Sequence, residues 1–302
     1  MRARVLVLSC LLFPLTLTAQ RGRDEAPPEP LLLDVMSFNI RTAAGRDGDN
    51  AWTFRKELVA ETIRRYSPDV MGLQEALTEQ IEFLEAALPE YRWLGVDRGL
   101  NGGVGLSEFT PIFYRYRELS PIESGTFWLS DTPDFPTRGR GSAGRGSARI
   151  VTWARFYHLA TSRQIYVFNT HVSSRRGDRQ LRAVEQITSH IAALPAESTV
   201  IAMGDFNAIA GTSDTWKVAT SNGLRDAWLL AEERRGPALT ANGFAPPPDG
   251  WEGRIDWILV EGPISVPEME TVVYEREGRY PSDHYPVVAK LVLDRGLPSA
   301  GR

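Results

Sequence analysis

Polar side chains that can bind a metal ion or move a proton recur at the ends of apolar runs in this sequence. They are Asn39, Glu75, His171, Asp205, Asn207, Asp283 and His284. Side chains at the ends of neighbouring strands are held within hydrogen-bond reach of one another by a rigid sheet. A single constellation would therefore account for all of them.

The oxygen atoms in this set are hard ligands of the kind that magnesium, manganese and calcium prefer. Zinc is poorly supported, because the four histidines show no paired ligand spacing and the only cysteine, Cys10, lies in an N-terminal apolar stretch. Hydrolysis of a phosphate ester requires charge neutralisation on the nonbridging oxygens, an activated water and a stabilised leaving oxygen. The set offers groups for each of these tasks.

Each group suits one part of this chemistry. Glu75 and Asn39 can hold the metal, and Asp205 can orient or deprotonate a water molecule. Asn207 can donate to the phosphate, while a histidine held by a carboxylate can stabilise a charged transition state. Taken singly, such residues are also typical of turns and strand ends. The chemistry is therefore indicated by the whole group.

Apolar periodicity places these residues on a mixture of strands and helices. Strands are predicted at 31–40, 70–73, 150–159, 165–172, 200–203, 255–260 and 287–293. Helices are predicted at 54–66, 78–88 and 178–194, where apolar residues recur with helical spacing. Strand pairs alternate with strand–helix units, so the order favours an α+β layered sandwich over a purely parallel sheet.

The composition favours one large domain. With 302 residues and 42% apolar side chains, the chain can bury a sizeable core. We predict a single domain at 31–295 and a short tail at 296–302. A polar, proline-rich stretch at 20–30 precedes the domain and is typical of a flexible spacer.

The first residues have the features of an export signal. Arg2 and Arg4 precede an apolar stretch from Val5 to Leu17, and small residues follow it. This stretch of about 13 residues is shorter than the roughly 20 that a membrane-spanning helix needs. We predict a signal peptide at 1–19 that is cleaved on export to the periplasm or the medium, which leaves no stable membrane anchor.

The charge balance bears on the substrate. The formal net charge is −4, and loss of Arg2 and Arg4 would make the exported protein more acidic. An acidic protein is poorly suited to broad capture of a nucleic acid backbone. Positive charge gathers locally in a glycine-rich loop at 137–149, which either closes over one or two phosphates or is simply solvated. Its arginines are Arg138, Arg140, Arg145 and Arg149.

Six short motifs follow one another in order along the chain. They are Met36-Ser37-Phe38-Asn39-Ile40, Leu73-Gln74-Glu75, Asn169-Thr170-His171-Val172, Gly204-Asp205-Phe206-Asn207-Ala208, Arg254-Ile255-Asp256-Trp257-Ile258 and Ser282-Asp283-His284-Tyr285-Pro286-Val287. With these motifs the chain resembles the endonuclease/exonuclease/phosphatase superfamily over about residues 31–293. The resemblance implies a four-layer α/β/β/α sandwich of two packed mixed β-sheets, with the site at one end of the sheets.

The resemblance also implies a role for each site residue. The residues matching the metal shell, with magnesium or manganese as the ion, are Asn39, Glu75 and Asp283. The residues matching catalytic positions are His171, Asp205, Asn207, Asp256 and His284. Among the latter, Asp205 matches the base that positions water, and Asp256 matches the residue that orients the His284 imidazole.

Two further segments bear on which subgroup of the superfamily the chain resembles. Residues 124–130 are most similar to a subgroup of bacterial secreted or cytosolic metal-dependent hydrolases. Ser173 and Ser174 stand after the Asn-x-His motif, where this subgroup is expected to carry Asp and His. The chemistry is therefore better defined than the substrate.

We predict an exported, metal-dependent phosphoric ester hydrolase that acts on a small phosphorylated metabolite, a sugar phosphate or a lipid headgroup. A secreted nuclease is the main alternative, and a non-catalytic binding module on the same fold is the lesser one. A serine hydrolase is disfavoured, because the adjacent residues Ser282, Asp283 and His284 cannot form a relay and no Gly-x-Ser-x-Gly elbow occurs. The oligomeric state is left open.

Overall fold

The computed structural model describes residues 30–99, 107–137, 148–175 and 177–293. The predicted signal at 1–19, nearly all of the spacer and the tail at 296–302 lie outside the described residues. So do Arg138, Arg140 and Arg145 of the glycine-rich loop, whereas Arg149 is described.

Thirteen named strands in the described residues form two mixed sheets. The first sheet has the order β10 (Glu233–Arg235), β12 (Ile264–Thr271), β13 (Val287–Leu293), β1 (Leu31–Asn39), β2 (Val70–Gln74), β4 (Ile112–Arg115) and β3 (Tyr91–Leu94). The second has the order β5 (Leu119–Trp128), β6 (Ile150–His158), β7 (Gln164–His171), β8 (Val200–Asp205), β11 (Asp256–Glu261) and β9 (Arg225–Asp226). Each sheet combines parallel pairs, such as β1 with β2 and β7 with β8, with antiparallel ones.

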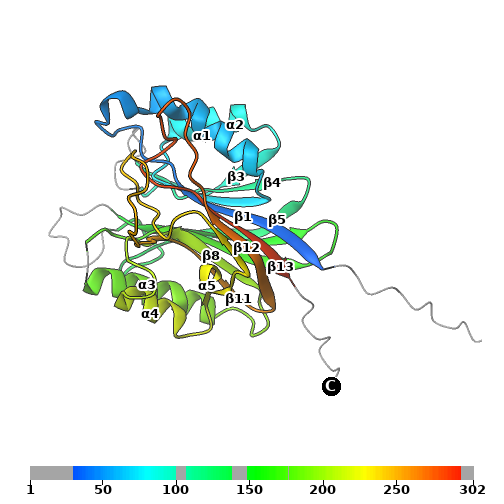
Figure 1. Cartoon of the computed structure of the whole chain (residues 1–302). Helices are drawn as coiled ribbons and strands as arrows, with labels where there is room; N and C mark the ends of the chain where they lie inside the picture. The colour runs from blue at the N-terminus through cyan, green and yellow to red at the C-terminus, as the bar shows by residue number, and fades with distance from the viewer. Residues whose placement is uncertain (1–29, 100–106, 138–147, 176, 294–302) are drawn as a thin grey trace, which may run out of the picture.

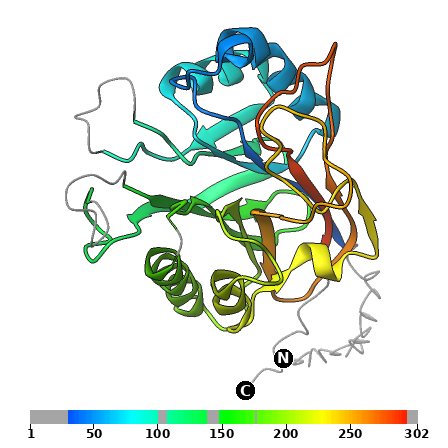
Figure 2. The same cartoon turned by 60° about the vertical axis from the view of Figure 1, so that its left-hand side comes forward.

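Helices cover the outer faces of the two sheets. The helical segments are η1 (Gly48–Asn50), α1 (Trp52–Tyr66), α2 (Thr78–Ala87), α3 (Asp178–Ala192), α4 (Asp214–Thr220) and α5 (Ala227–Leu230). In Figure 1, α1 and α2 lie above the first sheet, whereas α3 and α4 lie below the second. Figure 2 shows the same layers from a second direction. The predicted four-layer α/β/β/α sandwich is therefore confirmed.

Three apolar clusters hold these layers together. One lies between the sheets and includes Val35 of β1, Val167 of β7 and Ile258 of β11. A second packs α1 and α2 on the first sheet, and a third packs α3 on the second. Strands between two apolar layers are buried on both faces, which is why they read as continuous apolar runs in the sequence.

The strongest sequence signals match the observed elements, with small changes at the ends. The helix expected at 54–66 begins at Trp52, and the strand expected at 200–203 continues to Asp205. Strands β3, β4, β5, β9, β10 and β12 and helices α4 and α5 were not predicted. β5 shows one reason, because this edge strand contains Pro121 and Gly125 and is largely exposed along its middle.

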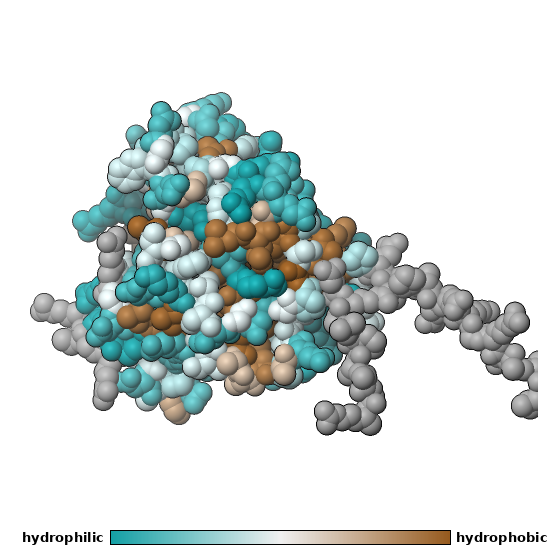
Figure 3. Space-filling model, turned by 60° about the horizontal axis from the view of Figure 1, so that its bottom comes forward, coloured by the Kyte–Doolittle hydropathy of each residue, from teal (hydrophilic) through white to brown (hydrophobic). Residues whose placement is uncertain are grey.

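The described surface is mixed in character. On the face shown in Figure 3, hydrophilic residues surround a band of hydrophobic ones. Large apolar side chains also remain exposed at Leu32, Leu159 and Leu229. Among the helices described, none is long and apolar enough to cross a membrane.

A buried polar side chain joins the two sheets next to the strand ends. Asn169 of β7 donates from Nδ2 to the carbonyl oxygens of Leu73, at 2.8 Å, and Pro111, at 2.9 Å. Its Oδ1 accepts from Nε2 of Gln74 at 2.7 Å. Gly72 leaves room for it, because a Cβ there would lie 2.5 Å from Cγ of Asn169. This network fixes β2 against β7.

We expect Asn169→Ala to lower the free energy of unfolding by roughly 2–5 kcal/mol, since it leaves several buried polar groups without a partner. Denaturant unfolding followed by circular dichroism measures the change. The exposed Asn222→Ala serves as the control and should change the stability little. An equally small effect of Asn169→Ala would show that the network does not join the sheets.

Candidate active site

The strand ends of both sheets bring the predicted residues together. Asn39 ends β1, His171 ends β7 and Asp205 ends β8. His171 lies opposite Asp205 in the parallel pair of β7 and β8. β11 runs the other way, so its first residue, Asp256, also lies opposite Asp205. The fold therefore gathers four of these side chains at one edge.

The carboxylate of Asp205 is the centre of this group. Its Oδ2 accepts from Nδ2 of Asn39 at 3.0 Å, across the two sheets, and lies 3.4 Å from Nε2 of His171. Its Oδ1 accepts from the backbone N–H of Asn207 at 2.9 Å. Burial and the nearby charge of Asp256 raise the pKa of Asp205 to about 7, although His284 and these hydrogen bonds act against the rise.

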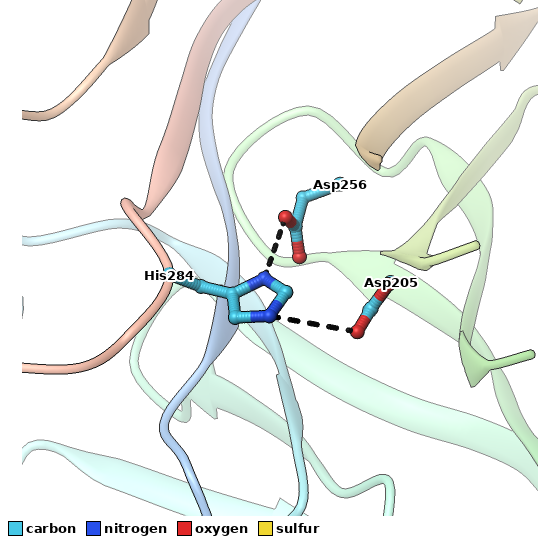
Figure 4. Close-up of side chains that lie close together, drawn as sticks. All are labelled: Asp205, Asp256 and His284. Atoms are coloured by element: carbon cyan, nitrogen blue, oxygen red, sulfur yellow. Dashed lines mark hydrogen bonds and ion pairs between the residues drawn. The ribbon is translucent and has the colours of Figure 1, made fainter. Parts of the chain in front are cut away.

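His284 is held between two carboxylates, as Figure 4 shows. Its Nδ1 lies 2.8 Å from Oδ2 of Asp256, and its Nε2 lies 4.0 Å from Oδ2 of Asp205. Burial disfavours the charged imidazole, but the charge and hydrogen bond of Asp256, with further help from Asp205 and Asp283, raise the pKa of His284 to about 10. The neighbouring carboxylates therefore favour the protonated form of this histidine.

His171 has the opposite character. Burial, together with the positive charges of Arg149, Arg98 and His284, lowers the pKa of His171 well below its usual range. Nη2 of Arg98 lies 3.4 Å from its Nδ1. Because a guanidinium can only donate, Nδ1 must accept, and the ring proton is assigned to Nε2, which faces Asp205. The site thus pairs a neutral histidine with a charged one.

Glu75 and Asp283 form the more open side of the site. Glu75 accepts from Nδ2 of Asn39 at 3.2 Å and from the backbone N–H of Thr42 at 3.1 Å. The guanidinium of Arg41 lies 3.9 Å from Glu75 and 3.7 Å from Asp283. The two carboxylates therefore face a common cationic neighbour.

Three residues at this edge have a positive backbone φ angle, which residues other than glycine seldom adopt. The φ angles are 55° at Arg41, 61° at Glu75 and 51° at Asn207. Each residue lies just after a strand, where the left-handed conformation turns the chain sharply. Strained backbone of this kind is concentrated at functional sites, which agrees with the placement of Glu75 and Asn207.

Buried groups from other elements support the turns. Arg55 of α1 donates to the carbonyl oxygens of Ile40, at 2.5 Å, Arg41, at 2.6 Å, and Pro281, at 3.0 Å. Ser282 Oγ donates to the carbonyl oxygen of Asn39 at 2.7 Å. These bonds fix the segment that carries Asp283 and His284 against the end of β1.

Two groups of side chains have the chemistry of metal ligands. Asp205, Asp256 and His284 offer atoms within 4.8 Å of one another, and Oδ1 of Asp256 is buried without a hydrogen-bond partner among the described residues. Nδ1 of His284, however, is already engaged by Asp256 at 2.8 Å, and the nearby carboxylates favour the protonated imidazole, which has no lone pair for a metal. Glu75 and Asp283, beside Asn39, offer oxygen atoms alone, which fits a hard divalent cation better.

All eight sequence-predicted residues thus lie in one connected group. Asp283 joins the others through Ser282 and Arg41. His158 and His190 lie elsewhere, since His158 is paired with Thr161 and His190 is stacked on Phe127. Sequence reasoning missed Arg41, Arg55 and Arg98. An arginine outside a motif has no local signal for its place in the site, because its contacts there join segments far apart in the sequence, such as Arg41 with Asp283, Arg55 with Pro281 and Arg98 with His171.

The chain belongs to the Endonuclease/Exonuclease/phosphatase family, whose model matches residues 36–284. Enzymes of this family are phosphoester hydrolases, so the predicted enzyme class is confirmed at that level.

Three relatives illustrate the similarity. An endonuclease/exonuclease/phosphatase family protein from Bacteroides thetaiotaomicron is 30% identical, with a TM-score of 0.80 over 88% of this chain and 100% of that one. The mannosyl-6-phosphatase Bt3783 of the same organism is 30% identical, with a TM-score of 0.77 over 86% and 99%. The uncharacterized protein L388 of Acanthamoeba polyphaga mimivirus is 29% identical over 168 residues, which are 52% of this chain and 59% of the viral protein. The match therefore spans less than two thirds of that relative.

We expect Asp256→Asn to lower the pKa of His284 by at least about 1 unit, because it removes the closest negative charge. A ¹H–¹⁵N NMR titration of the imidazoles in metal-free protein measures this pKa. The exposed Asp249→Asn should leave it unchanged. An unaltered pKa in Asp256→Asn would mean that Asp256 does not hold the charge on His284.

Proposed function

We propose that this protein is an exported, divalent-metal-dependent hydrolase of small phosphate esters. The observation that carries the proposal is the buried carboxylate of Asp205, which lies between the neutral His171 and the cationic His284. This arrangement offers a base, a hydrogen-bond donor and a positive charge around one reacting centre.

Glu75, Asp283 and Asn39 are the residues that would hold the ion. Magnesium or manganese bound there would neutralise charge on the phosphate oxygens. The oxygen-only chemistry of these side chains supports that assignment. The group of Asp205, Asp256 and His284 is then left for proton transfer and for charge stabilisation.

The reaction needs a water oxygen to bond to phosphorus while the bond from phosphorus to the leaving oxygen breaks. Asp205 orients the water and accepts its proton, and its raised pKa makes it a better base than an ordinary carboxylate. His284, held by Asp256, stabilises the negative charge of the transition state and is placed to supply a proton. Asn207 has a second Nδ2 proton to donate to a phosphate oxygen, and the Nε2–H of His171, which faces Asp205, is the one proton that His171 can offer at the reacting centre.

The substrate we propose is a small phosphorylated metabolite, sugar phosphate or lipid headgroup. The net charge of −4 disfavours a long nucleic acid. A relative of 30% identity is a mannosyl-6-phosphatase, which supports a sugar phosphate among these classes. The apolar segment after Arg2 and Arg4 supports export to the periplasm or the medium without a lasting membrane anchor.

We expect hydrolysis to stop when a chelator removes divalent ions and to return with magnesium or manganese. A panel of sugar phosphates, simple diesters, duplex DNA and RNA, assayed at several salt concentrations, identifies the substrate class. Full activity of the metal-free protein would contradict the mechanism. Efficient, strongly salt-sensitive cleavage of DNA without activity on small esters would instead favour a nuclease.

We expect Glu75→Gln to raise the metal concentration needed for half-maximal rate, since it removes a charged ligand but keeps the shape, so added metal should partly restore the rate. The exposed Glu79→Gln is the control for this variant. A Glu75→Gln enzyme that responds to metal as the wild type does would remove Glu75 from the metal site.

We expect Asp205→Asn to lower kcat by at least about 100-fold with little rescue by metal, because it removes the base.

A further inference from the structure

Two arginines flank His171 and have no part in the chemistry described above. Nη2 of Arg98 lies 3.4 Å from Nδ1 of His171, and Nη1 of Arg149 donates to the carbonyl oxygen of His171 at 3.4 Å. They reach this histidine from different segments, one after β3 and one just before β6. Two guanidinium groups therefore contact one histidine, and Nε2 of that histidine lies 3.4 Å from Oδ2 of Asp205.

This positive charge is only partly balanced. Arg98 is buried, with 5% of its surface exposed, and its Nε has no hydrogen-bond partner among the described residues. Its nearest carboxylate is that of Glu108, at 2.7 Å from Nη2. Glu108 also attracts Arg149, as do Asp205 and Glu75. Glu108 and Glu75 thus attract both cations, and Asp205 attracts Arg149 as well.

The two cations disfavour each other in this setting. Burial and the charge of Arg149 lower the pKa of Arg98 to about 10, although Glu108 and Glu75 act against this change. Burial lowers the pKa of Arg149 as well. Holding two such groups together costs free energy, and an anion bound between them would offset that cost.

The pair is also held in place before any ligand binds. The carbonyl oxygen of Arg98 accepts from Nε1 of Trp128 at 3.0 Å, and its backbone N–H donates to the carbonyl oxygen of Glu108 at 3.2 Å. The carbonyl oxygen of Arg149 accepts from the backbone N–H of Leu129 at 2.8 Å. These bonds hold the backbone of both arginines, and the ion pair with Glu108 holds the guanidinium of Arg98. Donors held in this way lose less entropy on binding, which is the usual property of a binding subsite.

We propose that Arg98 and Arg149 form an anion subsite that binds the terminal oxygens of a phosphate monoester, and that this pair makes monoesters better substrates than diesters. The proposal rests on the proposed function and names its substrate class more closely. A monoester carries a charge of about −2 near neutral pH and presents three terminal oxygens. A diester has one charge and two such oxygens, so it gains less from two guanidinium groups.

The first experiment measures binding without catalysis. Inorganic phosphate is titrated into chelator-treated protein by isothermal calorimetry, with Arg98→Met, Arg149→Met and the matching lysine variants. We expect each methionine variant to bind phosphate roughly 10- to 100-fold more weakly, and each lysine variant to keep part of the affinity. Arg155→Met is the control, because this partly exposed arginine on β6 pairs with Glu123 instead.

The second experiment compares two esters with the same leaving group, p-nitrophenyl phosphate and methyl p-nitrophenyl phosphate, in the metal-loaded enzyme. We expect Arg149→Met to lower kcat/KM for the monoester at least about tenfold more than for the diester. Thermal melting and the lysine variants separate this effect from misfolding. Arg98→Met should also alter the NMR titration of His171, since Arg98 faces Nδ1 of that ring.

The outcomes separate the subsite from the proposed function. The anion subsite is refuted if both methionine variants bind phosphate as tightly as the wild type. It is also refuted if Arg149→Met lowers kcat/KM equally for the two esters. Arginine-dependent phosphate binding in a protein that hydrolyses no phosphate ester supports the subsite but refutes the proposed function. Metal-dependent hydrolysis with arginine-independent phosphate binding supports the proposed function but refutes the subsite.

Discussion

The buried carboxylate of Asp205 is the group on which the rest of the site depends. A carboxylate with 1% of its surface exposed is costly unless donors surround it. Asn39 and the backbone of Asn207 donate hydrogen bonds to it, and Nε2 of His171 and of His284 lie 3.4 Å and 4.0 Å from it, so groups from both sheets surround this carboxylate. Asp205 therefore fixes how the two sheets meet at their open end.

The surrounding scaffold keeps that meeting point rigid. Asn169 binds the backbone beside β2 to β7, and Arg55 binds the turn after β1 to the segment before Asp283. Both side chains are fully buried, so their hydrogen bonds are directional constraints in a low-dielectric interior. The apolar clusters determine that the sheets pack, and these polar bonds determine where the strand ends lie.

Much of this could be predicted from the sequence, because the site residues sit in motifs at the ends of long apolar runs. β1, β7, β8 and β13 are buried on both faces along most of their length, which gives a strong local signal. β5 and β12 have weaker signals, since partly exposed strands with Pro or Gly are compatible with loops. The contacts that Arg41, Arg55 and Arg98 make at the site join segments far apart in the sequence, so no local sequence pattern predicts them.

The buried arginines also explain how an acidic chain can suit an anionic substrate. The net charge of −4 is spread over the surface, where water screens it. Arg41, Arg98, Arg149 and His284 instead concentrate positive charge around carboxylates that are partly or fully buried, where screening is weaker. A long polyanion is attracted by the charge of a broad surface, whereas a single phosphate responds to the few groups it touches. For this reason the positive groups at the site, more than the net charge, support the proposed binding of a small phosphate ester.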